Sequence, residues 1–207
     1  MSNIKASLEL TLPTEDSSFF EENSYVITEE ICLTPFLLRD IPCMVAVHQR
    51  SSDIHKYTTT VPASYSEDDA INFLSKVKSD MVHPSTGKCI KFVIRRRDTS
   101  EFIGLLGIYR SRNPKYKQEE EWWSLGYSIA AEWTGKGIVT ACVHYAMQEL
   151  GFKELGIRNW EAATLTGNMA SRRVLEKCGY RLLEDEIALD KVGTAEKLEG
   201  WSFECVI

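Results

Sequence analysis

Two glycines flank a lysine at the start of an amphipathic segment, EWTGKGIVTACVHYAMQELG, residues 132–151. A helix N-terminus leaves about four N–H groups without intrahelical partners and carries roughly half a positive charge. Gly135 and Gly137 would let a phosphate approach these donors closely, and Lys136 would add charge. The spacing matches neither the Walker loop nor the dinucleotide fingerprint. The segment therefore indicates either an anion site of another type or a strand-to-helix turn without a ligand.

A second helix start follows in TGNMASRRVLEKCGY, residues 166–180. Asn168 stands just before this helix, where asparagine is a favoured N-cap, and Ser171 falls in the first turn. Both residues would lie near the carboxyl end of the preceding strand, and ligands of α/β sheets favour such strand ends. The two helix starts could therefore face one crevice.

The elements that must position these residues follow from hydrophobic periodicity and turn signals. We expect strands at 25–36, 88–96, 101–110, 119–130, 157–165, 180–189 and 198–207, and helices at 37–50, 60–81, 135–150 and 168–179, the last two ended by Gly151 and Gly179. The order β-α-α-β-β-β-α-β-α-β-β predicts an α/β fold with a mixed sheet in one domain, residues 25–207. Residues 1–24 are expected to form a loosely ordered arm.

Composition limits the function classes. The 207 residues carry a formal net charge of −6, which disfavours nucleic acid as a general partner and favours a cationic acceptor. Six scattered cysteines form no C-x-x-C pair and no Cys/His cluster, so we expect reduced thiols and no metal. With no leader pattern and no apolar run of membrane length, we expect a cytoplasmic protein, the nucleus not excluded.

Three stretches together resemble the GNAT superfamily of acetyl-CoA-dependent N-acetyltransferases, within it the RimJ/RimL-like branch. TEEICLTPFLLRDI is similar to the opening strand and helix entry of that branch, and LGYSIAAEWTGKGIVTACV to its coenzyme-binding core. NMASRRVLEKCGY is close to its ending, N-x-x-S-x-x-V-L-E-K-x-G-F. The resemblance covers most of the chain, from about Tyr25, and it implies a single GNAT domain that uses acetyl-CoA.

The resemblance also implies where the coenzyme would bind. The family loop Q/R-x-x-G-x-G/A falls on six residues whose N–H groups would bind the pyrophosphate: Thr134, Gly135, Lys136, Gly137, Ile138 and Val139. Thr134 stands where the family has Gln or Arg, and Val139 where it has a small residue. The hydroxyl of Thr134 or Thr140 could add a donor to the anion site. The strand end formed by Ser128, Ile129 and Ala130 would pair its backbone with the pantetheine arm.

The thiol end of the coenzyme would lie at the second helix start. Asn168 would bond the coenzyme near its thiol, and Ser171 matches the serine that this branch is thought to use to protonate the leaving CoA thiolate. The tyrosine acid of other family members would fall at Leu175, which cannot donate. Ser171, or a water that it holds, is therefore the candidate acid.

Direct acyl transfer to an amine also needs a base and an N–H for the oxyanion, which we expect near Ile129. Strand alternation places Glu161 and Ala163 on one face of their strand, so Glu161 is a candidate base. It could instead pair with a cross-strand cation or lie at the sheet surface. Glu119, Glu120 and Glu121 are further candidates, more typical of a solvated strand lead-in.

In this family, the segment between the first two helices forms one wall of the acceptor site. His55, Tyr57 and Tyr65 could shape it, and one of the neighbouring Trp122 and Trp123 should line the cleft, for which we assign Trp123. The resemblance implies acetyl transfer to a primary amine, such as a protein N-terminus or a small-molecule amine, in a ternary complex. The alternative is a non-catalytic acyl-CoA-binding or regulatory module. Monomer and homodimer both remain open.

Overall fold

The computed structural model of the protein describes residues 12–111, 113, 115, 121–190 and 197–207, and it contains an eight-stranded sheet in the order β1-β2-β3-β4-β5-β6-β8-β7. The strands are β1 (Tyr25–Val26), β2 (Ile31–Thr34), β3 (Lys91–Arg96), β4 (Phe102–Arg110), β5 (Trp122–Ile129), β6 (Asn159–Leu165), β7 (Arg181–Asp190) and β8 (Lys197–Val206). Only β5 and β6 pair in parallel; the other neighbours are antiparallel. The predicted mixed sheet is confirmed.

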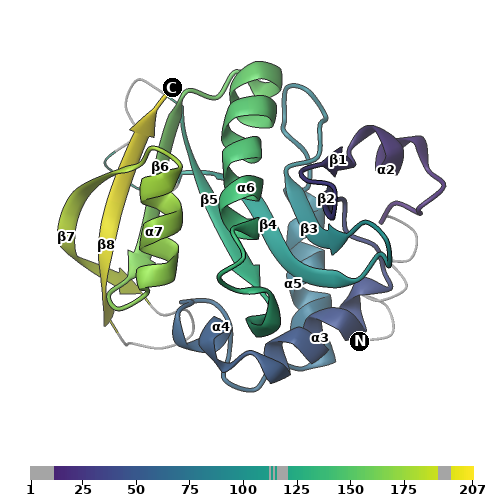
Figure 1. The fold of residues 1–207 in the computed structure, drawn as a ribbon, viewed down its shortest axis with the longest axis horizontal. Helices are drawn as coiled ribbons and strands as arrows, with labels where there is room; N and C mark the ends of the chain where they lie inside the picture. Colours follow the sequence, from purple (N-terminus) through teal and green to yellow (C-terminus); the bar gives the residue numbers. More distant parts are fainter. Residues whose placement is uncertain (1–11, 112, 114, 116–120, 191–196) are drawn as a thin grey trace.

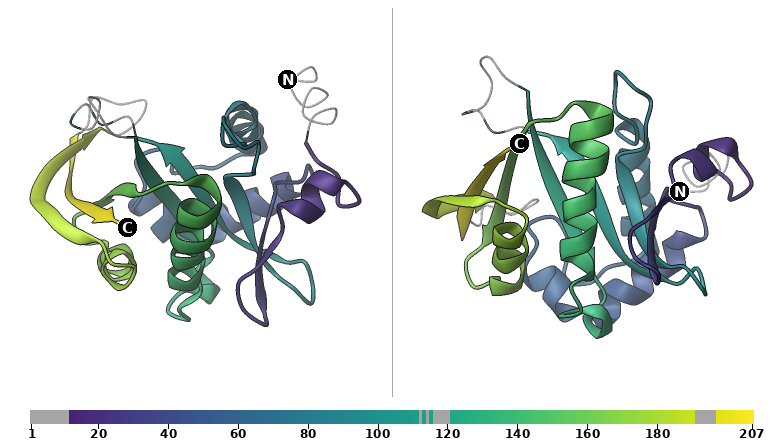
Figure 2. Two further views of the ribbon diagram at one scale, coloured as in Figure 1. Left: turned by 90° about the horizontal axis from the view of Figure 1, so that it is seen from above. Right: turned by 45° about the horizontal axis from the view of Figure 1, so that its top comes forward.

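Helices cover both faces of this sheet (Figures 1 and 2). The helices are α2 (Ser18–Glu22), α3 (Asp40–Arg50), α4 (Ser52–Lys56), α5 (Glu67–Ser79), α6 (Ile138–Tyr145) and α7 (Met169–Lys177), with the short 3-10 turn η2 (Ala131–Trp133) before α6. Helices α3 and α5 lie on one face, and α6 and α7 on the other. Because both faces are covered, the first five residues of β3 are all buried, the flanking Lys91 and Arg95 as well as the apolar run 92–94.

The first predicted strand, 25–36, is wrong as a single element. The chain turns back between β1 and β2, because the Thr28 hydroxyl accepts the N–H groups of Glu30 and Ile31 at 3.3 and 3.1 Å. This local bond closes a hairpin in place of a continuous strand. Helix α4 was not predicted either.

The predicted end of the third helix at Gly151 is also wrong. The helix continues from α6 through a π-helical stretch, η3 (Ala146–Glu154), and Gly151 lies inside it. A Cβ on Gly151 would lie 2.4 Å from Cζ2 of Trp160, so the glycine admits the indole ring to the helix surface. Close packing, and not helix termination, explains this residue. Gly179, with φ +89°, does follow the end of α7 as expected.

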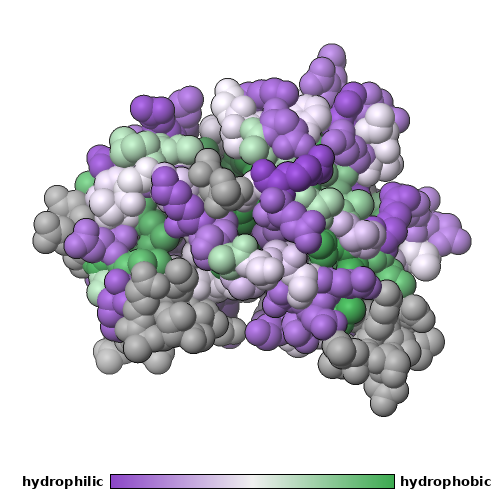
Figure 3. Space-filling view, turned by 90° about the horizontal axis from the view of Figure 1, so that it is seen from below, coloured by the Kyte–Doolittle hydropathy of each residue, from purple (hydrophilic) through white to green (hydrophobic). Residues whose placement is uncertain are grey.

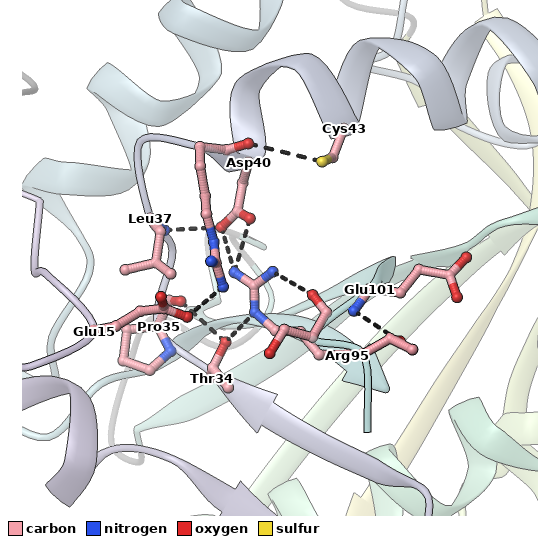
Figure 4. Close-up of polar contacts among 11 residues, drawn as sticks. Glu15, Thr34, Pro35, Leu37, Asp40, Cys43, Arg95 and Glu101 are labelled. Atoms are coloured by element: carbon pink, nitrogen blue, oxygen red, sulfur yellow. Dashed lines mark hydrogen bonds and ion pairs between the residues drawn. The ribbon is translucent and has the colours of Figure 1, made fainter. Parts of the chain in front are cut away.

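A buried ion pair attaches the start of α3 to the sheet (Figure 4). Arg95 Nη2 on β3 donates to both carboxylate oxygens of Asp40, at 2.8 and 2.6 Å, and the two side chains are 3% and 1% exposed. The same carboxylate accepts the N–H of Leu37 at 2.8 Å, and Arg95 Nε donates to the Thr34 hydroxyl at 2.8 Å. From the sequence, Asp40 in the first turn of α3 predicts only a favourable interaction with the helix dipole. In the structure its carboxylate also pairs with Arg95 and accepts the N–H of Leu37.

The described part of the arm, from residue 12, is attached to the domain. Leu12 is buried in the core, and Asn23, next to α2, accepts the N–H of Cys89 at 2.7 Å. Residues 1–11 of the predicted arm lie outside the described residues. The six cysteines are free, and four of them are buried. Among the described residues, no helix is long and apolar enough to cross a membrane.

Candidate active site

The parallel strands β5 and β6 separate partway along their length. They pair only at Trp122↔Asn159, Trp123↔Trp160 and Ser124↔Glu161, although both strands continue beyond these positions. Figure 1 shows their carboxyl ends diverging toward the end of the molecule where α6 and α7 begin. A gap in the backbone pairing therefore lies in the middle of the sheet, beyond the last paired residues of β5 and β6, and it is called the opening from here on.

The edge of β5 that faces this opening carries free backbone groups. On the other edge, Ala130 donates its N–H to Ile103 of the β4 side at 2.8 Å. Since successive residues of a strand direct their N–H groups to opposite sides, those of Tyr127 and Ile129 point toward the opening. Of the three residues predicted to pair with a pantetheine arm, Ile129 thus presents its N–H, whereas Ser128 and Ala130 direct theirs toward β4.

The Gly-Lys-Gly turn lies at the same end of the sheet. Gly135 and Gly137 have φ of +74° and +77°, and no atom lies within 4 Å of a Cβ built on either residue. Gly137 is the N-cap of α6, and no side chain caps this helix. The first N–H groups of α6 therefore face solvent without an intrahelical acceptor. This geometry favours the anion-site interpretation of the motif.

The polar side chains of the Gly-Lys-Gly turn contact neighbouring residues of the same segment. The Thr134 hydroxyl donates to the Ala131 carbonyl at 2.8 Å, and the Lys136 ammonium lies 4.2 Å from the centre of the Trp133 ring. Ile138 is buried and Val139 packs against the core, so neither side chain fills the space in front of the glycines; Thr140 is half-buried one turn into α6. Seen from below, this end of the molecule presents mostly hydrophilic residues with smaller hydrophobic patches (Figure 3).

The second helix start faces the opening from α7. Asn168 Oδ1 accepts the N–H of Ser171 at 3.1 Å, which makes Asn168 the N-cap of α7. The Ser171 hydroxyl lies 2.9 Å from the hydroxyl of Tyr127, on the part of β5 beyond its pairing with β6. This bond joins the two sides of the opening. Burial raises the pKa of Tyr127 to about 12, so its phenol stays protonated at neutral pH.

Sequence reasoning missed Tyr127. One signal could have found it: Tyr127 stands two residues before Ile129, inside the strand that was expected to bind the coenzyme. By the alternation of β5 it shares the face of Trp123 and Leu125, toward α6 and α7. A polar side chain at the end of such a strand is a candidate for the site.

Glu161 lies where the two strands separate. Its carboxylate accepts hydrogen bonds from the Ser111 hydroxyl at 2.5 Å and from the Asn113 amide at 3.4 Å. As predicted from alternation, Glu161 and Ala163 share one face of β6. They are more exposed than Trp160 and Ala162, which are buried on the other face. These described partners of Glu161, a hydroxyl and an amide, are neutral, so the described residues do not show the alternative in which Glu161 pairs with a cross-strand cation. Of the other candidate bases, Glu119 and Glu120 lie outside the described residues, and Glu121 pairs with Arg110 at 2.5 Å.

The predicted acceptor residues differ in burial and in the groups that they contact. His55 on α4 is half-buried, with Nδ1 3.0 Å from the Val61 carbonyl, and Tyr57 follows it closely. Tyr65 is 7% exposed and stacks on His48 at 4.0 Å.

Trp123 is 3% exposed and stacks on His83 at 5.0 Å, on the sheet face that α6 covers. It is the core member of the Trp122–Trp123 pair, and the half-buried Trp122 takes the opposite face. The assignment of Trp123 to the cleft therefore does not agree with its burial in the core. Among the described residues, no group of three or more His, Cys, Asp or Glu side chains is placed to hold a metal ion.

Comparison with known proteins connects this geometry to a family. Residues 30–181, most of the chain, match the family model described as "Acetyltransferase (GNAT) domain". The chain belongs to the GNAT acetyltransferase family. The family predicted from the three sequence stretches is thereby confirmed.

Two curated relatives of this GNAT chain come from Bacillus subtilis (strain 168), and each is named an uncharacterized N-acetyltransferase. YoaA is 33% identical over 92 residues, which make up 44% of this chain and 49% of YoaA. YnaD is 26% identical over 157 residues, which make up 76% of this chain and 82% of YnaD. The matched part thus spans about half the length of the first relative and most of the second.

Solved structures of the same fold include two that hold a coenzyme. The microcin C7 self immunity acetyltransferase MccE, in complex with acetyl-CoA and AMP, matches with a TM-score of 0.66 and 18% identity over 87% of this chain and 94% of MccE. The ribosomal L7/L12 α-N-protein acetyltransferase RimL, in complex with coenzyme A, matches with a TM-score of 0.67 and 12% identity over 89% of this chain and 98% of RimL. At these identities, the likeness concerns the fold.

Proposed function

We propose that the protein is an N-acetyltransferase that moves an acetyl group from acetyl-CoA directly to a primary amine in a ternary complex. The observation that carries the proposal is the opening between β5 and β6, which has free N–H groups on the β5 side and, at its mouth, the uncapped start of α6 and the start of α7, which Asn168 caps. The complexes of MccE and RimL with acetyl-CoA and coenzyme A support the choice of co-substrate.

The coenzyme would lie along the opening. The N–H groups from Gly135 to Val139 would bind the pyrophosphate, and the backbone of β5 near Ile129 would pair with the pantetheine arm, as a short added strand does. Asn168 would contact the coenzyme near its thiol end. These are the positions that the family resemblance implies.

The chemistry would need no covalent enzyme intermediate. A neutral amine attacks the thioester carbon, and the Ile129 N–H, directed into the opening, stabilises the oxyanion. Glu161, at the apex of the opening, takes the proton of the amine through water. The Ser171 hydroxyl donates to the sulfur of the leaving CoA. The acceptor wall would include His55 and Tyr57, while the buried Tyr65 and Trp123 take no part in it.

The test is a calorimetric titration of the purified protein with acetyl-CoA, followed by an assay of CoA release. The amines would be a peptide with a free N-terminus and a polyamine, and the same peptide with an acetylated N-terminus serves as the control. We expect micromolar binding and release with at least one free amine. Binding without release from any amine would favour the acyl-CoA-binding module, and absence of binding would refute the proposal.

Replacement of Ser171 by alanine should separate chemistry from binding. We expect Ser171→Ala to lower turnover roughly 10- to 100-fold, because the leaving sulfur loses its donor, while the affinity for acetyl-CoA changes less than about threefold. Ser75→Ala is the matched control, since the Ser75 hydroxyl donates to the Ile71 carbonyl within α5, away from the opening. Equal turnover in the two variants would remove Ser171 from the reaction.

A further inference from the structure

The hydrogen bond between Tyr127 and Ser171 joins elements that are 44 residues apart in the sequence and lie on opposite sides of the opening. The Tyr127 hydroxyl also lies 3.4 Å from the Ser171 carbonyl oxygen. It therefore reaches both oxygens of Ser171. Both elements border the opening in which the proposed coenzyme would lie, so this contact belongs to the site and not to a distant part of the core.

The position of Ser171 is fixed from two directions. Asn168 holds its backbone N–H at 3.1 Å, and Tyr127 holds its hydroxyl oxygen at 2.9 Å. A serine hydroxyl has one proton and rotates freely, so its direction depends on its partners. When the Tyr127 phenol donates to Ser171 Oγ, the serine proton must point elsewhere. The phenol can hold this role over a wide pH range, because burial raises the pKa of Tyr127 to about 12.

We propose that Tyr127 is a positioning residue that donates to Ser171 Oγ and so directs the Ser171 proton toward the sulfur of the coenzyme. This inference rests on the proposed acetyltransferase function. In the transfer step the amine nitrogen bonds the acetyl carbon, the carbon–sulfur bond breaks, and its electron pair stays on sulfur. The Ser171 O–H stabilises that thiolate by a hydrogen bond. The proton of the amine passes through water to Glu161, as proposed above, and the departing sulfur takes one proton from solvent water.

A thiol titration tests this role without knowledge of the acceptor. Bound CoA is the product of the reaction, and the ultraviolet absorbance of its thiolate reports the pKa of its thiol in the complex. A donor aimed at sulfur stabilises the thiolate, so in the wild type we expect the thiol of bound CoA to have a pKa below that of free CoA titrated in the same buffer. Tyr127→Phe, which keeps the ring, should shift the thiolate–thiol equilibrium back roughly three- to tenfold. The affinity for acetyl-CoA should change less than about threefold.

Tyr180→Phe is the matched control. Tyr180 is 3% exposed, and its hydroxyl has no hydrogen-bond partner among the described residues. Loss of that hydroxyl should leave the thiol pKa and the acetyl-CoA affinity unchanged. Because Tyr127 would act through Ser171, Tyr127→Phe should have no further effect on the thiol pKa in a Ser171→Ala background.

The outcomes distinguish this inference from the function on which it rests. Wild-type protein that fails to bind acetyl-CoA refutes both. Normal binding together with an unchanged thiol pKa in Tyr127→Phe refutes the positioning role alone and leaves the acetyltransferase proposal intact. An affinity loss of more than about tenfold in Tyr127→Phe would also refute it, since Tyr127 would then be a wall of the binding site. An additive effect in the double variant would show that Tyr127 acts independently of Ser171.

Discussion

Gly135→Glu should lower the affinity for acetyl-CoA by at least about 100-fold. The new carboxylate would stand where the pyrophosphate is proposed to bind, and two unit charges about 4 Å apart near a protein surface repel by roughly 4 kcal/mol. Each 1.4 kcal/mol is about a factor of ten in affinity, so charge repulsion alone exceeds the expected loss. Calorimetric titration of wild type and variant with acetyl-CoA measures it.

Gly156→Glu is the control for this prediction. Gly156 has φ +71°, close to the +74° of Gly135, and neither residue has an atom within 4 Å of a built Cβ. The two variants therefore carry the same charge change and nearly the same backbone strain, but Gly156 follows the far end of the α6–η3 helix. We expect Gly156→Glu to bind acetyl-CoA like the wild type. Similar losses in both variants would mean that strain, and not the anion site, explains the effect.

Gly135→Ala separates the two causes at the site itself. It adds the strain of a positive φ, about 1–2 kcal/mol for a residue with a Cβ, without any charge. We expect the folded protein to become less stable while most of its acetyl-CoA affinity remains. If Gly135→Ala lost as much affinity as Gly135→Glu, the shape of the turn would matter more than electrostatic repulsion.

Local signals predicted the parts of the candidate site that depend on nearby residues. The Gly-Lys-Gly turn and the Asn168 cap are each complete within a few residues, because a helix start needs only a strand before it and an N-cap or glycine. Val139 stands where the family has a small residue, and its side chain packs against the core. The strand alternation that separates Glu161 from Trp160 is likewise a local property.

The features of the fold and of the candidate site that the sequence does not predict depend on contacts between distant segments. β5 and β6 separate after Ser124 and Glu161, their last paired residues. Hydrophobic periodicity does not show where the pairing of two strands ends. The contact of Tyr127 with Ser171 exists only once α7 packs beside β5. Glycine commonly follows the end of a helix, so the sequence predicts an end at Gly151. The Trp160 ring that requires a glycine there lies on another element and leaves no signal in the local sequence. Trp122 and Trp123 could be assigned to opposite faces from sequence, but only the position of α6 decides which face is core.

Asp40→Ala should lower the free energy of unfolding by about 3–5 kcal/mol, a large part of the roughly 5–15 kcal/mol typical of a domain. The substitution leaves the Arg95 guanidinium, 3% exposed, without its carboxylate partner, and it also removes the acceptor of the Leu37 N–H. An uncompensated buried charge costs more than the net contribution of the pair. Urea unfolding of wild type and variant measures the difference.

Glu15→Ala is the control, because it removes an ion pair from the same region at the surface. Glu15 pairs with Arg39, next to Asp40 in the sequence, and the two side chains are 50% and 49% exposed. We expect a loss below about 1 kcal/mol, as for most exposed pairs. In the double variant Asp40→Leu/Arg95→Met the buried charge is gone, so part of the stability lost in Asp40→Ala should return. If Asp40→Ala cost no more than Glu15→Ala, the Asp40–Arg95 pair would not be what holds α3 to β3, and the orientation of the α3–α4 segment beside the opening would have to come from apolar packing alone.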